Sequence, residues 1–182
     1  MCDSMDDSTW DEPWNSDDLT RRGSAEEVTR SQMAAMQSEL GRRDSPAFER
    51  LKEHLRSPIE ISGAVVAEIV QMLRHRCFAD SQSFRKARGT ALWVELHWLT
   101  EDMLIDAFSV LWGSEHCKWW QSSALVQHRN AGPGLWGRVL SKRVDVRTVR
   151  DIGAAANARH DTAFLLHLKN SIGTLDIVTS DR

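Results

Sequence analysis

The longest apolar stretch of this 182-residue sequence, residues 91–112, limits most strongly what the chain can fold into. It reads ALWVELHWLTEDMLIDAFSVLW and contains three of the eight tryptophans. As one continuous helix it would be apolar on nearly every side, which predicts a central helix covered by amphipathic neighbours. Its only charges are carboxylates, which are costly in hydrocarbon and argue against a membrane span. They belong to Glu95, Glu101, Asp102 and Asp106.

Thr100, in the middle of this stretch, keeps a second interpretation open. A threonine is a good helix N-cap, and Glu101 and Asp102 would then lie in the first turn, where acidic side chains interact favourably with the helix dipole. The stretch would in that case divide into a strand over residues 91–98 and a helix that begins after Thr100. We prefer the continuous helix, and Gly113 ends the element in either case.

Helix start signals occur at three places before this stretch. Ser24 and Glu27 form a capping box. Ser45 precedes Pro46, a serine cap followed by a proline at the first helical position. Ser62 precedes another apolar run, VVAEIV. Polar or glycine-rich sequence predicts two loops, over residues 79–90 and 130–137.

These patterns together predict an all-α fold. We expect a single helical-bundle-like domain of about six helices over residues 24–182. An apolar share of 41% is enough to build its core. Residues 1–23 are predicted to form a disordered acidic tail, because Asp, Ser and Thr dominate them and no periodicity is present.

The charges are distributed unevenly, although the net charge is only −3. Residues 1–18 contain seven acidic side chains and no basic one, whereas residues 128–170 contain eight Lys and Arg against three Asp. The acidic tail and the basic C-terminal third are expected either to attract each other or to bind different partners. Three cysteines without paired spacing, and no secretory signal, predict an intracellular location, cytoplasmic or nuclear.

Two tryptophans, Trp10 and Trp14, lie among the carboxylates of the tail in TWDEPW. Acidic segments with spaced aromatic residues dock on basic, grooved partners, although the rings could equally pack back on their own domain. Tryptophan and arginine most often anchor protein interfaces. The leading prediction is therefore a non-enzymatic protein–protein interaction protein, an adaptor or accessory regulator. Its predicted partner-binding residues are Trp10, Trp14, Trp119, Trp120 and Trp136. Trp136 either fills the core or forms an exposed contact.

The C-terminal third supports a second prediction, DNA binding. In TVRDIGAAANA, Thr148 is expected to cap a short helix and Asn157 to adopt a left-handed turn before a second helix. Residues 146–170 thereby resemble the helix-turn-helix of bacterial repressors of the TetR type, whose second helix enters the major groove. An ordinary helical hairpin explains the same pattern. The residues that the resemblance implies for nucleic acid are Arg147, Arg150, Arg159, His160, Thr162 and Lys169.

A third alternative comes from the aromatic composition, which includes eight tryptophans and no tyrosine. The segments SPIEIS, TALW, DML and LWGS, between residues 57 and 114, resemble parts of the C accessory proteins of measles-like paramyxoviruses. This resemblance implies a helical viral accessory protein, encoded in an overlapping reading frame, that binds other proteins. No functional residue is carried over from it.

Motifs for catalysis or cofactor binding do not stand out in the sequence. GPGLWG lacks the Lys and Ser or Thr of a phosphate-binding loop, and no GxSxG nucleophile elbow occurs. The residues of suitable type for zinc lack paired ligand spacing. We therefore expect no enzyme activity, no cofactor and no metal site. The rejected zinc ligands are His75, Cys77, His97, His116 and Cys117.

Overall fold

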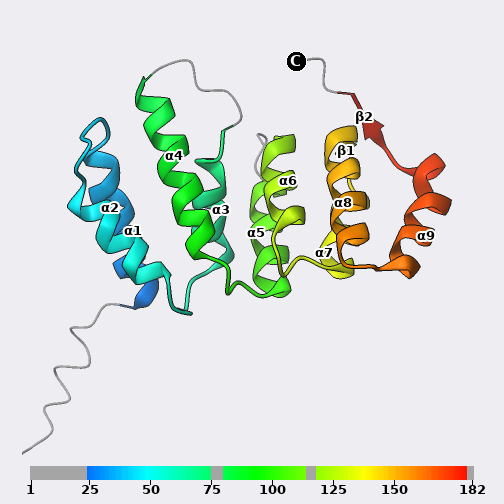
Figure 1. Cartoon of the computed structure of the whole chain (residues 1–182), viewed down its shortest axis with the longest axis horizontal. Helices are drawn as coiled ribbons and strands as arrows, with labels where there is room; N and C mark the ends of the chain where they lie inside the picture. The colour runs from blue at the N-terminus through cyan, green and yellow to red at the C-terminus, as the bar shows by residue number, and fades with distance from the viewer. Residues whose placement is uncertain (1–23, 75–79, 114–117, 180–182) are drawn as a thin grey trace, which may run out of the picture.

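The computed structural model describes residues 24–74, 80–113 and 118–179. In them nine α-helices stand side by side in a row that runs from α1 and α2 to α9 (Figure 1). This confirms the all-α prediction, although about six helices were expected. The helices are α1 (Ala25–Ser38), α2 (Pro46–Leu55), α3 (Gly63–Gln71), α4 (Asp80–Glu95), α5 (Glu101–Gly113), α6 (Trp119–Gln127), α7 (Pro133–Leu140), α8 (Val146–Ala158) and α9 (Thr162–Ser171).

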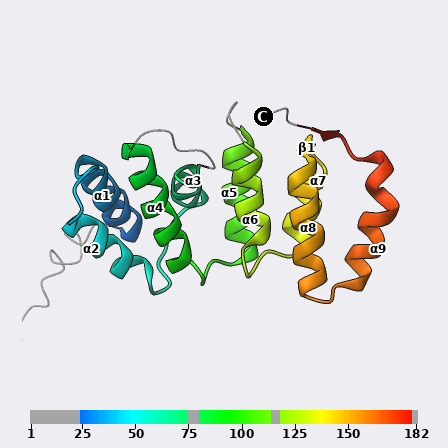
Figure 2. The ribbon, with the colours of Figure 1, turned by 45° about the horizontal axis from the view of Figure 1, so that its top comes forward.

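Both consecutive and alternate helices pack against one another along the row, and α1 also packs on α2. α1, α3, α5 and α7 contact in that order, while α2 packs on α4, α6 on α8, and α9 on α8. Figure 2 shows the same order of helices along the row from another side. Buried apolar side chains form one continuous cluster from α1 to α9. The row is therefore stabilised by contacts between successive helix pairs.

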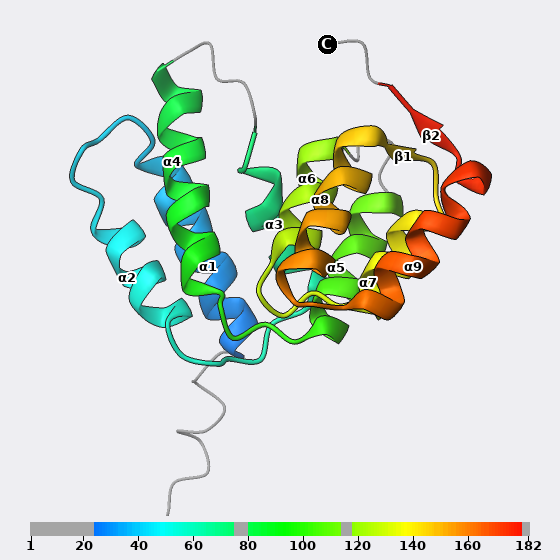
Figure 3. The ribbon, with the colours of Figure 1, turned by 45° about the vertical axis from the view of Figure 1, so that its right-hand side comes forward.

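Two very short strands lie at the end of the row that α8 and α9 occupy (Figure 3). β1 (Val144–Asp145) pairs in parallel with β2 (Ile177–Val178), which follows the 3₁₀ helix η2 (Ile172–Thr174). Their register places Val144 opposite Ile177. The pairing ties the segment after α9 back to the segment before α8.

The prediction of one continuous helix over residues 91–112 is wrong. α4 ends at Glu95, a turn follows, and α5 begins at Glu101. The alternative is half right: the hydroxyl oxygen of Thr100 accepts a hydrogen bond from the Met103 amide, but residues 91–98 form the end of α4 and a turn and do not form a strand. α5 also keeps an exposed face, which includes Val110, so it is not a helix covered on every side.

The turn between α4 and α5 is held by the loop between α6 and α7. His128 donates from Nε2 to the Leu96 carbonyl at 2.9 Å, and the Asn130 side-chain amide donates to the carbonyls of His97 and Leu99 at 3.0 and 2.7 Å. Carbonyls released by the end of a helix need such partners when they are buried. Leu96 and Leu99 are both fully buried. These hydrogen bonds, formed with residues about thirty positions later in the chain, explain why the apolar stretch divides here.

His128 is buried and neutral in this arrangement. Its Nδ1 accepts a hydrogen bond from the Asn130 amide at 3.1 Å while its Nε2 donates, which defines the tautomer. Burial, the largest effect, lowers the pKa of His128 below 6.5, and the nearby Arg129 and Arg159 lower it further, against the hydrogen bond to Leu96. Protonation would therefore oppose the folded state.

We expect the free energy of unfolding to decrease as the pH falls below about 6.5, because the unfolded chain then takes up a proton that folded His128 excludes. Above that pH the histidine is neutral in both states and contributes no pH dependence. The pKa values of Glu26 and Glu39 are lowered from 4.5 by hydrogen bonds, so the stability that these two carboxylates contribute is lost only at lower pH. Urea titrations between pH 5 and 7.5 should show a flatter dependence for His128→Gln than for the natural chain, and equal slopes would contradict this role.

The loop predicted over residues 79–90 is wrong for its described part, because residues 80–90 belong to helix α4. Arg88 is buried, and its guanidinium donates to the carbonyls of Met36, Glu39 and Arg42 at the end of α1. A cation is favourable there because the last carbonyls of a helix carry partial negative charge. The residue thus joins α4 to α1 and has a structural role.

The predicted loop over residues 130–137 contains the start of α7. Pro133 occupies the first turn, where its missing N–H costs nothing. The carboxylate of Glu101 accepts a hydrogen bond from the Leu135 amide at 2.9 Å. A Cβ atom at Gly132 or Gly134 would lie 3.0 or 3.2 Å from that carboxylate. The glycines therefore make room for an acidic group at the helix N-terminus.

Candidate interaction site

The five tryptophans predicted to bind a partner differ in their surroundings. Trp10 and Trp14 lie outside the described residues. Trp136 is 0% exposed, donates from its indole nitrogen to the Val126 carbonyl at 3.1 Å, and packs on Phe164 at 5.0 Å between ring centroids. Its prediction as an interface residue is wrong, because it fills the core between α6, α7 and α9. Only Trp119 and Trp120 remain in the described part.

Trp119 and Trp120 open helix α6 and are each half-buried. Their rings meet edge to face with centroids 6.2 Å apart. The guanidinium of Arg147, from the first turn of α8, lies 4.7 Å from the centre of the Trp119 ring, within the range of a cation–π contact. Aromatic and basic side chains from two elements therefore meet at this end of α6.

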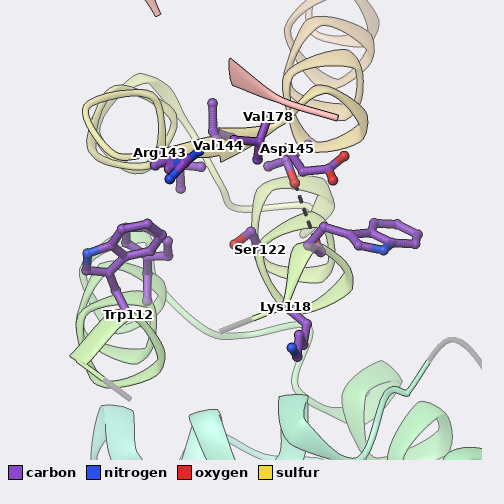
Figure 4. Close-up of a pocket in the computed structure, with 11 residues that line it drawn as sticks. Trp112, Lys118, Ser122, Arg143, Val144, Asp145 and Val178 are labelled. Carbon is purple, nitrogen blue, oxygen red and sulfur yellow. Dashed lines mark hydrogen bonds between the residues drawn. The ribbon is translucent and has the colours of Figure 1, made fainter. Parts of the chain in front are cut away.

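A pocket of about 220 Å³ opens beside them. Figure 4 shows Trp112 from the last turn of α5 across the opening from Ser122 of α6, with Arg143, Val144 and Val178 on one side and Lys118 on the opposite side. The remaining walls come from α5, α6, α7 and α8. The lining residues are Phe108, Trp112, Lys118, Trp119, Ser122, Val139, Arg143, Val144, Asp145, Thr148 and Val178.

The floor and walls of the pocket are fixed by local structure. Thr148 donates to the Trp119 carbonyl at 3.3 Å, and the buried carboxylate of Asp145 caps α8 by accepting from the Arg147 amide at 2.8 Å. Asp145 therefore replaces Thr148 as the cap of this helix, which corrects the sequence prediction. The pairing of β1 with β2 places Val178 opposite Asp145, and both residues line the pocket. Rigid secondary structure thus shapes the cavity.

Two basic side chains, Arg143 and Lys118, lie at the rim of the pocket, and the buried carboxylate of Asp145 is part of its lining. Arg143 is 68% exposed on its side chain, and its ion pair with the equally exposed Asp176 is long, at 3.9 Å. Such an exposed pair contributes little and is easily exchanged for another anion. Lys118, on the opposite side, is also exposed. Two cations around an aromatic cavity suit a ligand that combines a flat apolar group with negative charge.

The volume limits the kind of ligand. Pockets for cofactors and drug-sized molecules usually measure about 300–1,000 Å³. A cavity of about 220 Å³ is smaller and suits a single large side chain presented by another polypeptide segment. Interfaces often depend on such an anchor, most commonly a tryptophan, in a pocket of this kind.

The helical hairpin predicted over residues 146–170 is formed by α8 and α9, but two of its arginines contact their own chain. Arg147 covers Trp119, and Arg159 donates to the carbonyls of His128 and Arg129 at 2.8 and 2.7 Å and lies over Trp136. The other four predicted nucleic-acid residues are exposed. They are Arg150, His160, Thr162 and Lys169.

The outer face of α9 differs from that of a typical DNA-reading helix. Leu166 is 60% exposed on it, and Lys169 is the only Lys or Arg within the helix. Asp161 caps the N-terminus by accepting from the Phe164 amide at 3.0 Å, which places a carboxylate where phosphate would approach. The turn before α9 uses His160, with φ +57°, in place of the Asn157 expected from the sequence.

Sequence analysis did not single out Phe108, Trp112, Lys118 or Arg143 as binding residues. Phe108 and Trp112 are four residues apart on α5, but Lys118 and Arg143 lie on other segments, and no local spacing indicates that all four share one cavity. The composition gave a partial signal, since Lys118 directly precedes the Trp119–Trp120 pair. Among the described residues that were predicted to bind a partner, Trp119 is the one that lines the pocket.

Other features that would point to a particular activity are not found in residues 24–74, 80–113 and 118–179. This part of the chain contains no group of His, Cys, Asp and Glu side chains arranged to hold a metal ion. Of the five residues considered as zinc ligands, only His97 is described, and it is exposed. No helix in this part is both long and apolar enough to cross a membrane. No protein-family model, curated protein or solved structure matches the chain.

Proposed function

We propose that this chain is a non-enzymatic, intracellular interaction protein that holds an acidic, aromatic segment of a partner protein in the pocket between α5, α6 and β1. The observation that carries the proposal is the combination of Trp112 and Trp119 in the walls with Lys118 and Arg143 at the rim. This chemistry matches an aromatic anchor flanked by carboxylates. The small volume favours one anchoring side chain over a cofactor.

The rest of the fold supports a scaffold role. The helices are held by buried structural contacts, such as Arg88 at the end of α1 and His128 at the α4–α5 turn. The pocket is formed where several of these rigid elements end. A pre-formed site of this kind binds with little cost in ordering its own residues.

Reversal of one charge at the pocket rim tests the proposal. We expect Arg143→Glu to remove partners that the natural chain captures from its own cells, because a carboxylate would then face the acidic segment. The matched control is Lys142→Glu, which makes the same charge change at the neighbouring exposed residue outside the pocket lining. Capture should be compared by quantitative mass spectrometry with both variants as bait.

The partners lost with Arg143→Glu should be retained with Lys142→Glu. An equal loss with both variants would show that net charge alone matters and would contradict the pocket as the binding site. Retention of the same proteins by both variants would contradict it as well. Each capture is repeated with nuclease to test the DNA-binding alternative. If the chain binds its partners through nucleic acid, they should disappear when the nucleic acid is digested. The pocket proposal expects nuclease to change nothing.

A further inference from the structure

We propose that the pocket is occupied by the chain's own acidic tail, with one indole of TWDEPW, from Trp10 or Trp14, seated between Trp112 and Trp119. This inference rests on the proposed function, since it assigns an occupant to the same site. The tail is an internal competitor that partner segments must displace. Access to the site is thereby regulated within one molecule.

Charge complementarity supports this occupant. Residues 1–18 contain seven carboxylates and no basic side chain. Asp11 and Glu12 lie directly between the two tryptophans, so an indole in the pocket brings carboxylates to the rim with it. Lys118 and Arg143 lie at that rim, and Arg147 lies nearby over Trp119. Opposite charges at such short range favour the complex and fix its orientation.

The shape of the segment fits as well. Pro13 disfavours a helix through both rings and favours an extended backbone for Glu12. An extended segment presents successive side chains to opposite sides. One tryptophan can therefore enter a cavity of about 220 Å³ while the neighbouring carboxylates remain at its mouth.

The chain is long enough for this contact. α1 packs on α3 and α3 on α5, so the pocket is about two helix spacings, roughly 20 Å, from α1. The start of α1 lies on the lower side of the row and β1 on the upper side (Figure 1), which adds the length of α5, roughly 20 Å. Trp10 precedes Ser24 by fourteen residues, which span up to roughly 50 Å when extended. The tail therefore reaches the pocket of its own chain.

Tethering makes this contact effective even when the contact itself is weak. A segment joined by a short linker has an effective concentration in the millimolar range. Free ligands must compete with it, so their apparent affinity is reduced. Removing the two indoles should restore the affinity for an added segment.

The experiment uses a fluorescent peptide of residues 7–18, DSTWDEPWNSDD, and fluorescence anisotropy with the full-length chain. We expect the Trp10→Ala, Trp14→Ala double variant to bind this peptide about ten-fold or more tightly than the natural chain does, because its own tail no longer competes. Adding Arg143→Glu to the double variant should abolish most of this binding, while adding Lys142→Glu should not. The control peptide carries alanine in place of both tryptophans and should not bind.

Equal affinity of the natural chain and the double variant, still lost with Arg143→Glu, would overturn the tail as occupant and leave the proposed function standing. Absence of peptide binding to the double variant would likewise overturn it, and the capture experiment then tests the proposed function separately. Sedimentation of the natural chain tests whether the tail binds the pocket of a second copy instead of its own. Self-association that disappears in the double variant would mean that the tail fills the pocket of a second copy, which would overturn the intramolecular contact.

Discussion

Replacement of Trp136 by alanine is expected to lower the free energy of unfolding by about 3–5 kcal/mol. The indole is fully buried, packs on Phe164 and lies under Arg159. Its removal leaves a large cavity between three helices and deprives the Val126 carbonyl of its donor at the same time. Urea denaturation followed by circular dichroism measures the loss directly.

Trp112→Ala is the matched control for that measurement. It removes the same kind of side chain from the wall of the pocket, where Trp112 is 38% exposed. The expected loss is about 1 kcal/mol or less, because surface positions tolerate truncation. Similar losses for the two variants would contradict the assignment of Trp136 to the core. The pair also separates the tryptophan that stabilises the fold from one that belongs to the candidate site.

Gly63→Ala should produce the second large loss, about 1–3 kcal/mol, from overpacking. A Cβ atom at this position would lie 2.7 Å from the backbone carbon of Asp106 and 2.8 Å from the Ala107 nitrogen. These atoms belong to the backbone of α5 and cannot move aside as a side chain would. The first turn of α3 must therefore shift away from α5, which disturbs the packing of these two helices.

Gly137→Ala makes the identical chemical change in the opposite setting. Gly137 lies within α7, and no atom is within 4 Å of the position its Cβ would take. Alanine should stabilise the chain there by about 0.4–1 kcal/mol, because it reduces the freedom of the unfolded state. Thermal unfolding of the two variants side by side should give shifts of opposite sign. A loss of stability in both variants would contradict overpacking against α5 as the cause of the loss at Gly63.

Local signals in the sequence predicted part of the fold correctly. The Ser24 side chain accepts from the Glu27 amide, and Ser45 caps α2 by accepting from the Phe48 amide, as their sequence patterns indicate. These interactions depend only on residues within one turn. Asp145 in place of Thr148 shows the limit of such signals, since both residues are suitable caps and the packing of Thr148 against Trp119 decides between them.

Contacts between distant residues account for the errors. The break after Glu95 depends on His128 and Asn130, which lie more than thirty residues later, outside the apolar stretch. The glycines of the α7 loop look like a flexible connection until Glu101 is placed beside them.

The candidate site is non-local in the same way. Trp112, Lys118 and Arg143 meet only after three elements have packed. Trp119 and Trp136 were both predicted to bind a partner, because nothing local in the sequence distinguishes the buried Trp136 from Trp119 of the pocket.

The hydrogen bonds of His128 and Asn130 to the α4–α5 turn have a consequence for how the molecule unfolds. In a simple linear array each unit contacts only its neighbours, and the ends can fray independently. Here the turn between α4 and α5 is held by hydrogen bonds from the loop between α6 and α7. Melting of that loop would expose the carbonyls of the turn to water, so we expect the helices on both sides of the turn to unfold in one cooperative transition.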